Sequence, residues 1–128
     1  MSQMANTVCV RYFILVLRPT TIFSLRNETV TESPDTIAVE LFCNISGNPL
    51  PEITWLYNDE TFELTGLAEN NCKNIQHGYF HYKNVPHKLI ICKPHQKDTG
   101  FYSCLAKNQL ANARMKAYLN VLCEYSFI

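Results

Sequence analysis

Apolar and polar residues alternate in short runs along most of this chain. The clearest run extends from Val39 to Ile45, where every second residue is apolar and Glu40 and Asn44 lie between them. A period of two is typical of a β-strand with one buried face. The pattern therefore predicts a strand here, with Asn44 on its exposed side.

The same pattern recurs elsewhere, with turn residues between the runs. It predicts strands at 23–25, 28–31, 52–57, 61–64, 79–82, 88–92, 101–107 and 113–121. Proline cannot donate to a strand ladder, so the segment 47–51 is expected to be a turn. We find no repeat or linker. The sequence predicts one all-β domain over 23–122, a lead-in at 1–22 and a tail at 123–128.

Two cysteines and two aromatic residues have the spacing of a disulfide-linked sandwich. Cys43 and Cys104 are 61 positions apart, Trp55 follows the first cysteine by 12 positions, and Tyr102 precedes the second by two. In immunoglobulin-type sandwiches a tryptophan packs on the disulfide between the sheets, and a tyrosine hydroxyl bonds to the backbone of the preceding turn. These four residues therefore predict an inter-sheet disulfide and a tyrosine corner.

The chain resembles an immunoglobulin domain of the intermediate set, the I-set. The matching residues are Asn48–Trp55, Leu89, Ile91, Asp98, Gly100, Tyr102, Cys104, Ala117, Leu119 and Val121. The resemblance implies a two-sheet antiparallel sandwich with Trp55, Leu89 and Tyr102 in its core. Asp98 is expected to accept hydrogen bonds in the turn before the tyrosine, and Gly100 to supply backbone freedom there.

Composition indicates an extracellular chain. Six cysteines among 128 residues suit an oxidising compartment. Asn27 and Asn44 each begin an N-glycosylation acceptor triplet. Eleven basic and eleven acidic side chains balance, which argues against nucleic acid as a partner.

The N-terminal segment has two interpretations. The run 8–17 is apolar but contains Arg11, and Arg18-Pro19 follows where a signal peptide would carry small residues. It is either a poor signal peptide, or else an unstructured lead-in, a remnant of a preceding domain or a mis-predicted exon. No run reaches the ~20 apolar residues of a membrane-spanning helix.

A second disulfide, Cys72–Cys92, is a further hypothesis. Leu89 and Ile91 are expected to face inward, which turns Cys92 to the outer face of its sheet. Cys72 lies in a long polar insertion, 69–86, that could cover that face. The alternatives are two free thiols, or a bond from Cys72 to Cys9 or Cys123.

The sequence does not indicate an enzyme, a cofactor or a metal site. It has no phosphate-binding glycine loop and no nucleophile motif. Three residues separate His77 from His81. Strand-like residues surround His81, so surface histidines are expected rather than zinc ligands.

The expected function is protein binding outside the cell. Residues 46–61 are similar to the immunoglobulin repeats of vascular endothelial growth factor receptors, which implies ligand or receptor–receptor contacts by a fragment of such a receptor. The alternatives are an adhesion or axon-guidance domain, or an intracellular muscle-type repeat. The candidate contact residues are Phe42, Leu56, Tyr79, Phe80 and Tyr82, unless the insertion covers them.

Overall fold

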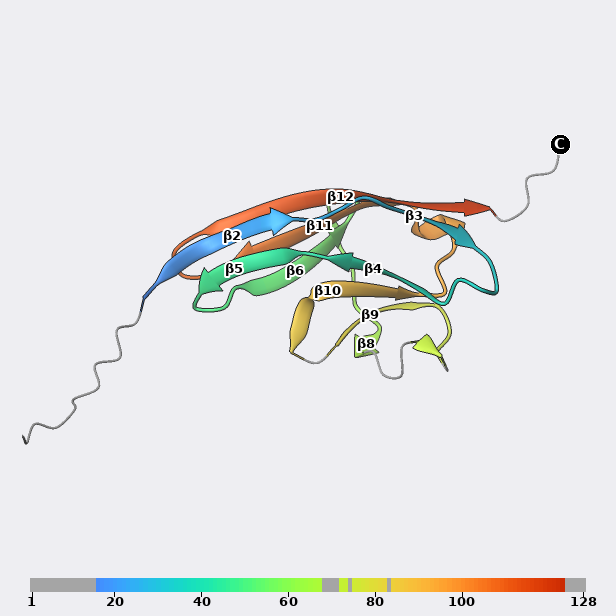
Figure 1. The fold of residues 1–128 in the computed structure, drawn as a ribbon, viewed down its shortest axis with the longest axis horizontal. Helices are drawn as coiled ribbons and strands as arrows, with labels where there is room; N and C mark the ends of the chain where they lie inside the picture. Colours follow the sequence, from blue (N-terminus) through green and yellow to red (C-terminus); the bar gives the residue numbers. More distant parts are fainter. Residues whose placement is uncertain (1–15, 68–71, 74, 83, 124–128) are drawn as a thin grey trace, which may run out of the picture.

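Strands make up nearly all of the regular structure (Figure 1). The computed structural model describes residues 16–67, 72–73, 75–82 and 84–123. The elements are β2 (Arg18–Ser24), β3 (Glu28–Glu32), β4 (Ala38–Phe42), β5 (Asn44–Asn48), β6 (Glu52–Tyr57), β7 (Glu60–Thr61), β8 (Gly66–Leu67), β9 (Gly78–Tyr82), β10 (Val85–Cys92), the 3-10 turn η2 (Gln96–Asp98), β11 (Gly100–Lys107) and β12 (Asn112–Cys123).

The strands form two packed layers. One layer is a five-stranded sheet in the order β3-β12-β11-β6-β7, and the other is a four-stranded sheet in the order β4-β10-β9-β8. The pairs β3–β12 and β8–β9 are parallel, and the remaining pairs are antiparallel. In Figure 1, β12 and β11 lie above β10 and β9. The predicted all-β, two-sheet sandwich is confirmed.

A further strand pair, β2–β5, continues the four-stranded sheet. Strand β5 begins just after β4 ends, and Cys43 between them donates its backbone N–H to the carbonyl of His87 over 2.8 Å. Strand β2 then pairs antiparallel with β5. Strands β4, β5 and β2 thus lie along one edge of this layer.

The main core lies between the two sheets. It contains the predicted core residues Trp55, Leu89 and Tyr102 together with Leu25, Val39, Leu41, Cys43, Ile91, Cys104, Ala117, Leu119 and Val121. Those on strands are the inward positions, because alternate side chains of a strand point to opposite faces. Burial of apolar surface at roughly 25 cal/mol per Å² makes this cluster the main source of stability.

A second, smaller core lies on the outer face of the four-stranded sheet. It comprises Cys72, Phe80, Ile90 and Cys92, with Ala38, Ile75 and Tyr82 packed against it. Four consecutive residues at the end of β10, Leu89 to Cys92, are therefore all buried. The insertion covers this face, as the hypothesis of a second disulfide required.

Some boundaries differ from the expected ones. Strand β2 begins at Arg18, before residue 23, and β12 continues to Cys123. The segment 18–22 was missed because it is mostly polar and shows no alternation of apolar residues. Its buried residue is Thr20, which is polar. The short strand β8 was not predicted. The run 8–17 lies outside the described residues except for Val16 and Leu17.

Candidate functional site

The two sheets are joined by the disulfide Cys43–Cys104. Both cysteines are fully buried, and their Cα atoms are 6.4 Å apart. Trp55 is the cross-strand neighbour of Cys104 and belongs to the same buried cluster. Its indole N–H donates to the carbonyl of Pro86 over 2.9 Å, so the polar atom of this large side chain is satisfied.

The predicted tyrosine corner is present in the structure. The Tyr102 hydroxyl donates to the backbone carbonyl of Asp98 over 2.6 Å. Gly100 lies between them and packs closely on Tyr57, since a Cβ at this position would lie 2.7 Å from a carbon of the Tyr57 ring. A larger residue would therefore push Tyr57 away from the corner.

Asp98 is a fully buried carboxylate with three partners around it. The His95 backbone N–H donates to it over 2.7 Å, which lies within the turn as expected. Two further partners come from the insertion: the Tyr79 hydroxyl donates to the carboxylate, and His77 Nε2 lies 2.8 Å from it. Asp98 thus ties the insertion to the turn before β11.

Burial raises the pKa values of the two tyrosines at this corner, Tyr79 and Tyr102. Loss of solvent raises the pKa of Tyr79, and the neighbouring Asp98 carboxylate raises it further. Burial also raises the pKa of Tyr102, with smaller contributions from Tyr79 and Asp98. Both phenols remain protonated donors, which suits a structural role better than proton transfer.

The second disulfide, Cys72–Cys92, is formed in the structure. Both residues are fully buried and their Cα atoms are 5.5 Å apart. Cys123 is a free and exposed cysteine. Cys9 lies outside the described residues.

The candidate contact residues differ in exposure. Phe42 is 46% exposed, but Leu56 and Phe80 are only 7% and 6% exposed. The expectation that Leu56 and Phe80 form a contact surface is therefore wrong. Tyr79 and Tyr82 are half-buried, the first in the corner and the second against the smaller core.

The buried Leu56 has polar and charged neighbours on the outer face of its sheet. On the outer face of the five-stranded sheet, Leu56 lies beside Ser103, and Ser103 lies beside Lys116. The Lys116 ammonium reaches Asp59 in the turn after β6, over 3.2 Å. Lys116 thus links β12 to the turn after β6 across the outer face of the sheet.

An exposed aromatic pair on this face was missed from the sequence. Phe101 and Tyr118 are direct cross-strand neighbours with ring centroids 4.9 Å apart, and they are 46% and 36% exposed. Lys116 lies 5.3 Å from the centre of the Phe101 ring. Arg114 also bonds to Asp59. We call Phe101, Tyr118, Arg114, Lys116 and Asp59 the aromatic face.

The alternation of β11 and β12 could have identified the aromatic face. Tyr102 and Ala117 are inward neighbours, so the adjacent Phe101 and Tyr118 must point outward. Two cations share one carboxylate there, and their hydrogen bonds and charges lower the pKa of Asp59. The face therefore carries an excess of one positive charge.

Both glycosylation triplets are accessible in the structure. Asn27 and Asn44 are exposed. The side-chain oxygen of Asn27 accepts a hydrogen bond from the Tyr118 backbone N–H over 2.8 Å, which places Asn27 at the rim of the aromatic face. Asn44 lies on the opposite layer, at the start of β5.

The histidines occur in different surroundings. His77 contacts Asp98 and stacks on His95 at 4.5 Å, whereas His81 Nδ1 lies 2.9 Å from the carbonyl of Tyr82. Within the described part of the chain, no group of three His, Cys, Asp or Glu residues could hold a metal ion. That part also contains no helix long and apolar enough to cross a membrane.

Comparison with known proteins agrees with this architecture. The family profile of the immunoglobulin I-set domain matches residues 24–121. Vascular endothelial growth factor receptor 2 of Coturnix japonica is 33% identical over 106 residues, which cover 82% of this chain and 7% of the receptor. Cell adhesion molecule Dscam1 of Drosophila melanogaster is 35% identical over 100 residues, which cover 77% of this chain and 4% of that protein.

A solved structure shows the same fold. A chain in the crystal structure of a mutant complex of titin M10 with the obscurin-like 1 Ig domain superposes with a TM-score of 0.64 at 20% identity, covering 87% of this chain and 100% of that one. This chain thus spans a small part of its curated relatives, and receptor, adhesion and titin proteins all contain domains like it. The chain belongs to the immunoglobulin I-set domain family.

Proposed function

We propose that this chain is an extracellular protein-binding module of a receptor or adhesion protein, without catalytic activity of its own. The observation that carries the proposal is the pair of buried disulfides, Cys43–Cys104 and Cys72–Cys92. Disulfides persist in oxidising compartments and are rare in the cytosol. A glycoprotein with modified Asn27 and Asn44 fits the same location.

The aromatic face is the proposed contact surface. Exposed aromatic side chains beside an arginine are typical of the residues that dominate protein interfaces. Phe101 and Tyr118 supply an apolar centre, and the excess positive charge of Arg114 and Lys116 over Asp59 favours a partner with carboxylates at its rim. The proposed partner is an immunoglobulin-type repeat of a receptor or adhesion ectodomain.

Similarity to a growth-factor receptor favours one finer role. Vascular endothelial growth factor receptor 2 of Coturnix japonica matches 82% of this chain. We propose that the domain is part of a receptor of this kind and makes ligand or receptor–receptor contacts. An adhesion role is the second candidate, supported by the similarity to Dscam1. An intracellular repeat like those of titin is the third, and it would carry the same cysteines as thiols.

A binding assay tests the contact surface. We expect the tetramerised, disulfide-bonded domain to bind saturably to at least one member of a panel of receptor and adhesion ectodomains that includes this domain itself. The double variant Phe101→Ser/Tyr118→Ser should weaken that binding by roughly 30-fold, the size of a hot-spot loss.

The matched control is Phe42→Ser, because Phe42 has the same exposed fraction as Phe101, 46%, but lies on the other sheet. It should leave binding unchanged. Absence of binding to every ectodomain, or equal binding by the double variant, would contradict the proposal.

A further inference from the structure

A groove lies beside the glycosylation triplet at Asn44. It has a volume of about 360 Å³ and is lined by Ser24, Arg26, Glu28, Glu40, Phe42 and Asn44. This volume is at the lower end of that of small-molecule sites, which suits one or two sugar rings. The acceptor asparagine is thus itself part of the wall of a small polar groove.

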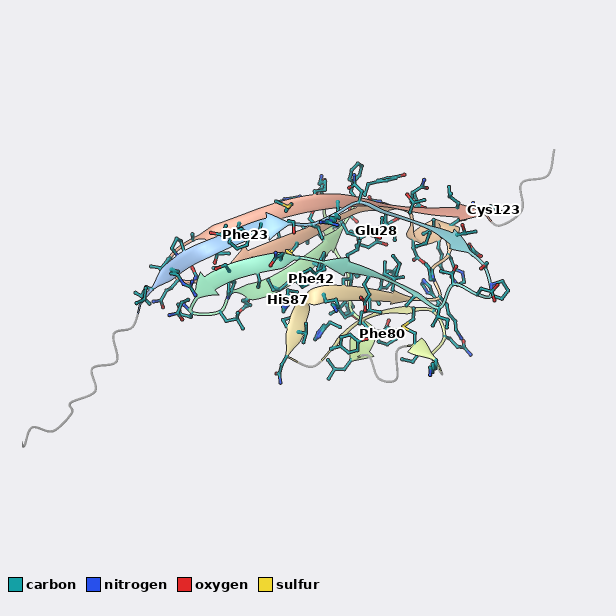
Figure 2. All side chains as sticks on the ribbon, in the orientation of Figure 1. Phe23, Glu28, Phe42, Phe80, His87 and Cys123 are labelled. Carbon is teal, nitrogen blue, oxygen red and sulfur yellow. A yellow bond between two sulfur atoms is a disulfide. The ribbon has the colours of Figure 1, made fainter. Side chains whose placement is uncertain are left out.

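Strand geometry brings an aromatic ring next to the acceptor. Phe42 and Asn44 lie on either side of the buried Cys43, so both side chains point outward. Phe42 packs against His87 with ring centroids 5.5 Å apart, and Figure 2 shows these two side chains close together. Lys88 Nζ lies 5.9 Å from the centre of the Phe42 ring, so the ring has partners that hold it in place.

The rest of the groove carries hydrogen-bonding groups. Arg26 is a donor, whereas Glu28 and Glu40 are acceptors, and Arg26 and Glu40 are exposed. Lys88 lies 3.7 Å from the Glu40 carboxylate, whereas Arg26 and Glu28 form no ion pair with the other described residues. An aromatic surface with polar groups around it is complementary to a sugar ring, which has C–H groups on its faces and hydroxyls at its edge.

We propose that Asn44 is N-glycosylated and that the first N-acetylglucosamine residues of its glycan lie in this groove against Phe42. This inference rests on the proposed function, since attachment requires the secretory pathway. In the transfer, a bond forms between Asn44 Nδ2 and C1 of the sugar, and the bond from C1 to the polyprenyl diphosphate carrier breaks. The carrier leaves as its diphosphate, and the amide gives up one proton.

The second acceptor, Asn27, does not line this groove, although Glu28 of its triplet does. The Asn27 side chain is held by the Tyr118 backbone, and Asn27 is not among the residues that line the groove at Phe42. A glycan there is expected to extend into solvent. The two sites therefore differ in whether the sugar is packed on the domain.

The test uses the domain secreted from animal cells in a Thr29→Ala background, which removes the Asn27 triplet but keeps the Asn27 hydrogen bond. Peptide mapping after enzymatic release of the glycan in heavy-oxygen water should find Asn44 occupied. Deglycosylation should then lower the melting temperature by roughly 4 °C, a shift that corresponds to a modest stabilising contact in a domain of this size.

Phe42→Ser should abolish that difference, whereas Phe101→Ser should retain it. A second measurement is the rate of glycan release from the folded domain, which Phe42→Ser should increase several-fold because the packed sugar is then freed. An unoccupied Asn44, or an equal temperature shift with and without Phe42, would overturn the inference.

These outcomes separate the inference from the proposed function. If the secreted domain contains both disulfides and binds a partner but Asn44 is empty, only the inference fails. If the disulfides do not form in the secreted domain, the proposed function fails as well.

Discussion

Asp98 is a fully buried carboxylate that contacts hydrogen-bonding groups from its own turn and from the distant insertion. Its partners are the His95 backbone and the side chains of Tyr79 and His77. The motif around Tyr102 predicted the first of these partners because the turn is local in sequence. The other two belong to the insertion and could not be predicted, since nothing in the sequence indicates where residues 77 and 79 lie relative to the turn.

Removal of the Asp98 carboxylate should destabilise the domain strongly. Asp98→Ala leaves the Tyr79 hydroxyl and the His95 N–H buried without an acceptor, and we expect a loss of about 3 kcal/mol in the free energy of unfolding. Urea unfolding measures this loss. Asp35→Ala is the matched control, because Asp35 is exposed, and should change stability by less than about 0.5 kcal/mol. Equal stability of the two variants would contradict the structural role of Asp98.

The buried tyrosines predict a loss of stability in alkali. An ordinary tyrosine has a pKa of 10.0, but burial raises the pKa values of Tyr79 and Tyr102 in the folded domain. Above about pH 10 the unfolded chain therefore releases phenolic protons that the folded chain keeps, so rising pH favours unfolding. The free energy of unfolding should fall as the pH is raised from about 9 to 11, and less steeply in Tyr79→Phe. An identical slope in that variant would count against this assignment.

At the scale of elements, strands such as β4 and β12 could be predicted because each has one buried face and follows the period of two. The end of β10 is instead buried on both faces, and its sequence there is a continuous apolar run. Exposure of individual side chains could not be predicted where a second layer covers the outer face. Phe80 is buried against other residues of the insertion, and Leu56 is buried on the outer face of the five-stranded sheet, although both alternate as outward residues.

The disulfide of the insertion should stabilise the smaller core. Cys72 and Cys92 are 20 positions apart, and closing a loop of this length contributes about 3 kcal/mol by the chain-entropy estimate. The variant Cys72→Ala/Cys92→Ala should unfold at lower urea concentration while Cys43–Cys104 remains intact. Unchanged stability would mean that the insertion does not depend on its disulfide.

At the scale of the whole molecule, the two layers have different surfaces. The five-stranded sheet presents the aromatic face, and the four-stranded sheet is covered by the insertion and, as we propose, by the sugar at Asn44. This asymmetry leaves the aromatic face as an open aromatic surface for a protein partner. It also explains why Phe42 and Phe101, with equal exposure, are assigned different roles.

Glycosylation at the rim should limit access to the aromatic face. Asn27 accepts a hydrogen bond from the Tyr118 backbone N–H, so a glycan on Asn27 would begin at the rim of the aromatic face. We expect Thr29→Ala, which removes this glycan, to strengthen partner binding several-fold. Domain that is produced in bacteria and refolded carries no glycan, so the same substitution should leave its partner binding unchanged. A strengthening that also appears in the bacterial protein would show that Thr29 itself, and not the glycan, is responsible.

The state of the cysteines tests the central proposal most directly, because it separates an extracellular module from an intracellular repeat. The measurement is a peptide map, under non-reducing conditions and after thiol blocking, of the protein recovered from cells that express it naturally. We predict two cross-linked peptide pairs, Cys43 with Cys104 and Cys72 with Cys92. Recovery of these four cysteines as blocked free thiols would contradict the proposal that the domain works outside the cell.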